Sequence, residues 1–156
     1  MLEYFTRLLA YNRWANHSVV IMLQEQSITD EKIYTLFSHL LSAEQVWYRR
    51  IIGQSMEGID LWGTRSLDVL AQEVETNYQV WETLLDGSVD FNREVHYTNT
   101  RGDDFSTPMW EIMVHVMNHG THHRGQLLSR LRAINASVRP LDFIAFVRQS
   151  PLTSTP

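Results

Sequence analysis

The sequence predicts an all-α protein, a four-helix bundle that carries a short β-hairpin insertion and a short C-terminal helix. Four stretches of about twenty residues repeat apolar side chains every three or four positions, the period of an amphipathic helix. None of them contains proline beyond its first turn, and one segment between them alternates apolar and polar residues as a strand does. The 156 residues suit one domain, which we expect over 1–150, followed by a flexible tail over 151–156.

The first helix is predicted over 2–26 and the second over 30–53. A polar break separates them, and either Thr29 or Asp30 can act as the N-cap of the second helix. Gly53 is expected to end that helix, since glycine readily adopts the left-handed conformation of a C-terminal cap. The apolar positions are Phe5, Leu8, Leu9, Ala15, Val19, Met22 and Leu23 in the first helix, and Leu36, Leu40, Ala43 and Trp47 in the second.

A loop is predicted over 53–65, because this segment holds three glycines and few regularly spaced apolar residues. Its length favours a functional role, and Trp62 is a candidate lid residue. Ser66 is expected to cap a third helix that runs to Gly87. The side chains at helical spacing in that helix are Leu67, Leu70, Val74, Asn77, Tyr78, Trp81, Leu84 and Leu85.

The hydrophobic period changes over 89–107. Phe91, Val95 and Tyr97 alternate with polar residues, and the Arg-Gly-Asp sequence at 101–103 supplies a turn. We therefore predict a short β-hairpin in this segment. Its presence makes a simple up-down-up-down order of the helices less secure, so the sequence leaves the connection order open.

A long fourth helix follows the hairpin. Thr107 is expected to be its N-cap and Pro108 its first residue, because the fixed φ angle of proline suits the first turn. The helix should continue to about Ile134. A short terminal helix is predicted over 141–148.

The composition excludes several classes of protein. With 44% hydrophobic and 20% charged residues, and no apolar run approaching the roughly 20 residues of a membrane span, we expect a cytoplasmic protein. A net charge of −5 argues against nucleic acid as a partner, because phosphate binding needs a basic face. The absence of cysteine excludes disulfides, thiolate metal ligands and a protein thiol nucleophile.

Histidine is the unusual residue of this chain, with seven in all and four between 115 and 123. At about 100° per residue from Ile112, His119 lies near −20° and His123 near +20°, within the apolar stripe of the fourth helix. Two buried neutral imidazoles would each need partners for two ring nitrogens, whereas a divalent ion would satisfy one nitrogen of each. The pair therefore predicts a metal site.

His39 is the natural third ligand, because it lies on the broad apolar face of the second helix. Three histidines with a water molecule in an open position would suit a catalytic divalent metal, whereas a closed structural zinc site would require four protein ligands. The alternative is that these histidines are core residues bonded to backbone or carboxylate groups. The i, i+4 spacing together with a ligand on a second helix favours the metal site.

Five other residues are weaker candidates for a role at the metal site or in a substrate pocket. His115 and His122 lie at the edge of the stripe, where they would support the ligands or simply border the core. Arg124 could anchor a substrate anion, although a structural role is favoured. Tyr11 and Trp14 could line the mouth of a pocket, although aromatic residues at helical spacing more often belong to a core.

Two classes of metalloenzyme do not fit the residues. Zinc proteases of the His-Glu-x-x-His type carry a glutamate directly after the first histidine, and Gly120 occupies that position here. Di-iron bundles require Glu-x-x-His pairs, and the sequence contains none. A site for a single metal ion fits better.

Three segments resemble one known family. They are Asn118-His-Gly-Thr-His-His-Arg-Gly-Gln126, His39 with the following Leu-Leu-Ser-Ala-Glu-Gln-Val-Trp47, and Tyr11-Asn-Arg-Trp-Ala-Asn16. Together they are similar to the DinB/YfiT-like metalloenzymes, and the resemblance spans nearly the whole domain. It implies a four-helix bundle, usually a homodimer, with a divalent metal on three histidines that correspond to His39, His119 and His123.

The resemblance also implies a class of chemistry. Characterised relatives include transferases and a maleylpyruvate isomerase that depend on a low-molecular-weight thiol. We therefore expect a small-molecule transferase that activates a thiol cosubstrate, or a hydrolase that uses metal-bound water, with Zn or Ni as the first choice of metal and Fe, Mn or Cu as others. The alternatives are a non-catalytic metal-binding stress-response module and a metal-free helical bundle.

Overall fold

The computed structural model describes residues 1–149 and shows the expected mostly helical fold with a short hairpin. The predicted flexible tail over 151–156 lies outside the described residues. The elements, in chain order, are α1 (Leu2–Glu25), α2 (Glu31–Ile52), α3 (Leu67–Asp86), β1 (Glu94–Thr98), β2 (Asp104–Pro108), α4 (Met109–Ala133) and α5 (Phe143–Gln149).

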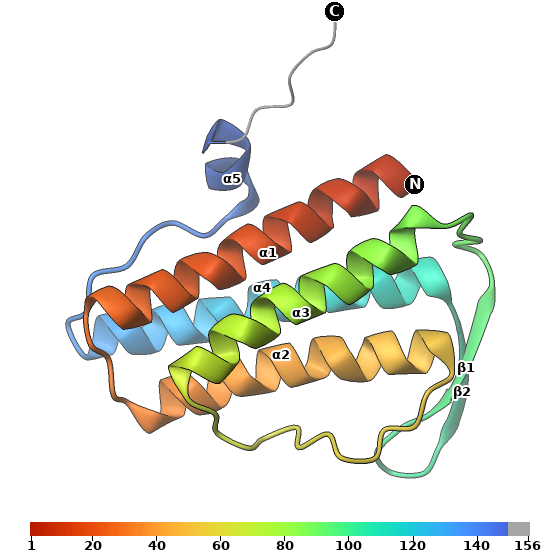
Figure 1. Cartoon of the computed structure of the whole chain (residues 1–156), viewed down its shortest axis with the longest axis horizontal. Helices are drawn as coiled ribbons and strands as arrows, with labels where there is room; N and C mark the ends of the chain where they lie inside the picture. The colour runs from red at the N-terminus through yellow and green to blue at the C-terminus, as the bar shows by residue number, and fades with distance from the viewer. Residues whose placement is uncertain (150–156) are drawn as a thin grey trace, which may run out of the picture.

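The helices form a bundle in which α1 packs mainly against α3 and α2 mainly against α4. Figure 1 shows that α2 and α3 run in one direction and that α1 and α4 run in the other. The loop 53–66 makes this arrangement possible, because it carries the chain back along the length of the bundle before α3 begins (Figure 1). The connection order that the sequence left open is therefore up-down-down-up.

The helix ends follow the local sequence in most places. The Asp30 carboxylate accepts hydrogen bonds from the amides of Lys32 and Ile33, so Asp30 caps α2 as one of the two expected candidates. Gly53 ends the same helix with a left-handed φ of 70°. Ser66 precedes α3 as expected, but its side chain makes no capping hydrogen bond.

The start of α4 corrects the sequence prediction. Pro108 is the last residue of β2 and the N-cap of α4, and Met109 is the first helical residue, so Thr107 is not the cap. The hairpin extends further than expected because Thr107 pairs with Val95 and Pro108 pairs with Glu94. The strand thus continues directly into the helix.

The interior of the bundle contains two apolar clusters. One includes Phe37 and Leu131 and lies towards the α1–α2 turn, and the other includes Trp81 and Met113 and lies towards the hairpin. A buried polar layer lies near the middle of the four helices, made of Asn12, Asn16, Glu44, Asn77 and Arg124. Within the described residues, no helix has both the length and the apolar character that a membrane crossing requires.

Candidate metal centre

The three predicted histidines come together between α2 and α4. His39 lies on α2, and His119 and His123 lie one turn apart on α4, which packs antiparallel against α2 (Figure 1). One ring nitrogen of each residue lies within 4.8 Å of the others. The structure therefore places three imidazoles where they could hold one metal ion.

The distance between the two α4 histidines fits a shared ion. Their Nε2 atoms are 3.1 Å apart. Two nitrogens bound to one Zn²⁺ at about 2.05 Å, with a tetrahedral angle between them, would be about 3.3 Å apart. One neutral imidazole can also donate a hydrogen bond to the other across the observed distance, so the pair needs little movement to exchange that bond for an ion.

His39 is oriented by the loop that follows α2. Its Nδ1 atom lies 3.0 Å from the carbonyl oxygen of Leu61. Because a carbonyl can only accept, Nδ1 must carry the proton, and in the neutral ring Nε2 then carries the free lone pair. Trp62 stacks on the same imidazole, with ring centroids 3.7 Å apart and planes 10° from parallel. The loop thus fixes both the tautomer and the plane of His39.

The electrostatics of the site favour neutral imidazoles. Burial is the largest cause that lowers the pKa of His119 to about 4, and the neighbouring His123 and His39 contribute to the same shift. Burial, followed by the effect of His39, also lowers the pKa of His123. Neutral rings are the form that binds metal, so His119 and His123 need not lose a proton at neutral pH.

The depth of the site differs from the prediction. His39 is buried, with 9% of its surface exposed, but His119 and His123 are only half-buried. The buried stripe of α4 instead runs through Gly120 and Arg124, about a quarter-turn from the two histidines. The centre is therefore at the margin of the α2–α4 seam. The Nδ1 atom of His123 is buried there without a hydrogen-bond partner among the described residues.

The two weaker histidine candidates lie beside the centre. His115 is exposed and packs edge-on against Trp47, and its ring centroid is 5.6 Å from that of His119. His122 is also exposed, and its Nε2 atom lies 3.0 Å from Nε2 of Gln126. Neither belongs to the group of three that could share an ion.

Tyr11, Trp14 and Arg124 lie away from the three histidines. The Tyr11 hydroxyl donates to the carbonyl oxygen of Leu141 at 2.8 Å, and Trp14 packs against Phe146 of α5. Arg124 points towards α1, where it is 2% exposed. These side chains therefore do not line the centre, because they face the opposite side of α4 or the outer side of α1.

Arg124 belongs to the buried polar layer, which sequence reasoning did not recognise. Its Nη1 atom donates to Oδ1 of Asn12 at 2.6 Å and of Asn16 at 2.8 Å. The amide nitrogens of these two asparagines donate to Oε1 of Glu44 at 2.7 and 3.0 Å, and Asn77 donates to Oε2 at 2.9 Å. Each of the two asparagines thus accepts a hydrogen bond from the buried guanidinium and donates one to the buried carboxylate. Both buried charges are therefore compensated.

Gly120 makes room for this arrangement. A Cβ atom there would lie 2.9 Å from Oδ1 of Asn12 and 3.0 Å from Nη1 of Arg124. Gly125 has no such role, because no atom lies within 4 Å of a Cβ built there. Gln126, the next residue, is exposed. Asn77, on an otherwise apolar stripe, was the sequence signal for the polar layer.

Fold and site together define a class: helical bundles in which histidines from two facing helices form a group able to hold a metal ion. The chain belongs to the DinB family, whose family model matches residues 1–151. It is similar to Protein DinB of Bacillus subtilis (strain 168), with 26% identity over 160 residues, which cover 92% of this chain and 93% of that protein. No solved structure was found to match the chain.

Proposed function

We propose that the protein binds one divalent metal ion through His39, His119 and His123. The observation that carries this proposal is the 3.1 Å separation of Nε2 of His119 and Nε2 of His123, with His39 facing them. Imidazole ligands suit Zn and Ni, which we take as the first candidates, ahead of Fe, Mn or Cu.

We further propose that the centre is catalytic. Three protein ligands leave at least one position on a tetrahedral ion open to an exchangeable ligand. A divalent ion in such a site makes a bound thiol or water molecule more acidic, and so a better nucleophile near neutral pH. Because the chain contains no cysteine, the thiol would be a low-molecular-weight cosubstrate, and the reaction its transfer to a small electrophile or, with water, a hydrolysis.

The surrounding residues suit this role. The Leu61 carbonyl and the Trp62 ring hold His39 in one orientation, which reduces the reorganisation needed when the ion binds. The lowered pKa of His119 keeps that ring unprotonated. The half-buried position of His119 and His123 leaves the centre within reach of a small substrate from solvent.

A screen for metal-dependent turnover tests the catalytic proposal. Metal-loaded protein would be assayed with several low-molecular-weight thiols and small electrophiles, and separately with ester and amide substrates in the absence of thiol. The expected result is turnover that requires both the loaded metal and His39. Full metal occupancy without turnover in any of these assays would count against catalysis and leave metal binding intact.

A second function is supported by the position of the ligands on two helices. An ion held by α2 and α4 would join the two halves of the bundle, as expected for a non-catalytic stress-response module whose metal stabilises the fold. In that case chelation should lower the melting temperature strongly, and no ligand position should exchange with solvent.

We also propose that the protein is a homodimer. The family resemblance implies it, and the exposed apolar side chains of Tyr4 and Phe143, which border one groove between α1, α4 and α5, supply surface for a partner. Sedimentation equilibrium should give twice the chain mass of 18.3 kDa. A single species of 18.3 kDa would overturn this proposal.

A further inference from the structure

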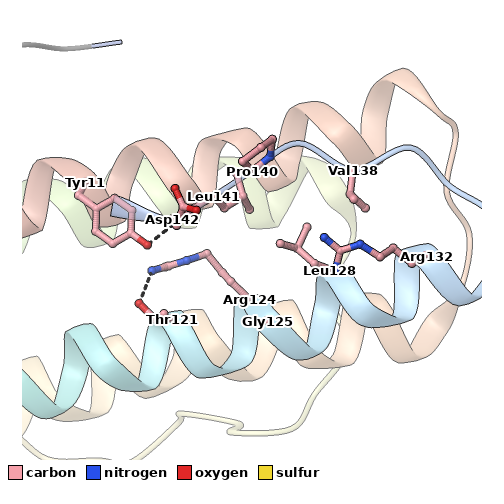
Figure 2. A pocket seen from close by; sticks show the side chains of 10 residues that line it. All are labelled: Tyr11, Thr121, Arg124, Gly125, Leu128, Arg132, Val138, Pro140, Leu141 and Asp142. Carbon is pink, nitrogen blue, oxygen red and sulfur yellow. Dashed lines mark hydrogen bonds between the residues drawn. The ribbon is translucent and has the colours of Figure 1, made fainter. Parts of the chain in front are cut away.

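The two sides of α4 are bordered by different parts of the chain. On the side that faces α1, Thr121 and Arg124 line a pocket together with the segment that leads to α5 (Figure 2). On the side that faces α2, the loop 53–66 reaches His39 of the metal centre through the Leu61 carbonyl. The contacts that hold this loop in place therefore bear on the centre itself.

Residues 60–65 of the loop are bound to α2 by hydrogen bonds. Four side chains of α2 take part, and they are Thr35, Ser38, His39 and Ser42. Their partners, in the same order, are Thr64, Arg65, Leu61 and Asp60. Arg65 also pairs with Glu73 of α3 at 2.8 Å. The loop is therefore held against the bundle on both sides of Leu61.

Asp60 builds the turn that presents the Leu61 carbonyl to α2. Its Oδ1 atom accepts hydrogen bonds from the amides of Trp62 at 3.0 Å and of Gly63 at 2.8 Å, as aspartate does where it starts a turn. Its own carbonyl accepts from the buried Ser42 hydroxyl at 3.0 Å. Both chain neighbours of Leu61 are thus fixed, which sets the direction of the carbonyl between them.

Gly63 leaves the room that the Asp60 carboxylate occupies. A Cβ atom built there would lie 2.7 Å from Cγ of Asp60 and would overlap one of its oxygen atoms. The φ angle of Gly63 is not in the left-handed region, so the carboxylate, and not the backbone conformation, disfavours a side chain here. A residue larger than glycine at this position would therefore push the carboxylate out of the turn.

The direction of the Leu61 carbonyl decides which nitrogen of His39 is free. The carbonyl oxygen lies 3.0 Å from Nδ1, so it accepts a hydrogen bond from Nδ1–H and leaves the lone pair on Nε2. Without this acceptor, the neutral ring could carry its proton on Nε2 instead. That nitrogen would then have no lone pair for a metal ion shared with His119 and His123.

We propose that Asp60 is a positioning residue of the metal centre. It holds the Leu61 carbonyl on Nδ1 of His39 and so keeps Nε2 of that ring free for the ion. This role rests on the proposed metal centre, but the hydrogen bonds that carry it involve only groups of the protein. The two amides need one acceptor oxygen and no charge, so asparagine should replace Asp60 and alanine should not.

Two properties of the full chain test the proposal. The tautomer of His39 is read from two-bond ¹H–¹⁵N correlations of its ring, with chelator present, at about pH 8, where a histidine of ordinary pKa is neutral. The affinity for Zn²⁺ is measured by competition with a chelator of known affinity.

The variants are Asp60→Ala and Asp60→Asn, with Gly63→Ala as a second way to displace the carboxylate. Glu57→Ala is the matched control, because Glu57 is an exposed acidic residue of the same loop. Its backbone takes part in hydrogen bonds, but its side chain makes none within residues 1–149.

We expect the Nδ1–H tautomer of His39 in wild type, Asp60→Asn and Glu57→Ala, and a mixture of both tautomers in Asp60→Ala and Gly63→Ala. The last two variants should bind Zn²⁺ about tenfold more weakly, the lower end of the effect of groups that orient a metal ligand. An unchanged tautomer in Asp60→Ala and Gly63→Ala would overturn the proposal, whatever happens to the melting temperature. Equal loss in Asp60→Asn and Asp60→Ala would assign the effect to the charge of the carboxylate and would also overturn it.

The tautomer of His39 also separates this proposal from the proposed function. If wild-type protein takes up no Zn²⁺, the metal centre fails, but the tautomers of the variants still decide whether Asp60 positions His39. If wild type binds Zn²⁺ and the tautomer does not depend on Asp60, the metal centre stands and the positioning role falls.

Discussion

The Trp62 indole lies flat on the His39 imidazole, with 3.7 Å between the ring centroids, although 58% of the tryptophan surface is exposed. An exposed tryptophan that covers one predicted ligand connects the 53–66 loop directly to the metal centre. The loop therefore acts on the site through ring stacking as well as through the Leu61 hydrogen bond.

Trp62→Ala should weaken metal binding by about two- to tenfold, since a stacked aromatic pair contributes about 0.5–1.5 kcal/mol. Competition with a chelator of known affinity measures the change. Trp110→Ala is the control, because that side chain is also partly exposed but lies at the start of α4. Equal affinity of the Trp62 variant and wild type would show that the stack does not order His39.

Gly120→Ala and Gly125→Ala should have opposite effects on stability. Alanine favours a helix over glycine by about 1 kcal/mol, and Gly125→Ala should gain part of this. At Gly120 the new methyl group would press on Asn12 and Arg124, whose charge-assisted bond contributes about 1.5–3 kcal/mol, so the net effect should be a loss of roughly 1–2 kcal/mol. Urea unfolding measures both, and a stabilised Gly120→Ala variant would contradict the assigned role of this glycine.

The metal-free protein should lose stability as the pH falls from about 6.5 towards 4. The pKa of His119 is about 4 in the folded chain, against an ordinary value of 6.5, so the unfolded chain binds more protons between these values. The stability that this residue contributes is complete above 6.5 and is lost on acidification. His119→Gln should flatten the pH dependence measured by urea unfolding in the presence of chelator. If the unfolding free energy changes with pH equally in the variant and the wild type, the pH dependence does not come from His119.

The sequence predicted the helices, the hairpin and the three histidines, because these follow from local periodicity and spacing. It misjudged the depth of His119 and His123 because a helical wheel assumes that the buried stripe is apolar. The true stripe of α4 passes through Gly120 and Arg124, and Arg124 is buried because polar groups of other helices compensate it. Such pairing is long-range and is not encoded in the period of any single helix.

The path of the chain between α2 and α3 also could not be predicted from local sequence patterns. The loop 53–66 returns along the bundle and brings Leu61 and Trp62 to His39, which precedes them by about twenty residues. Its glycines and its length predicted a loop, but the position of this loop against the bundle depends on packing between α2, α3 and α4. The stack on His39 could therefore be found only in the structure.

Metal content tests the central claim most directly. Untagged protein purified without chelator, and again after reconstitution with Zn²⁺ or Ni²⁺, would be analysed by inductively coupled plasma mass spectrometry beside His39→Ala, His123→Ala and the control His96→Ala, an exposed histidine on β1. We predict about one ion per chain in wild type and in the His96 variant, and loss of the ion in both site variants. Wild-type protein that holds no metal even after reconstitution would contradict the proposal that the three histidines bind a metal ion.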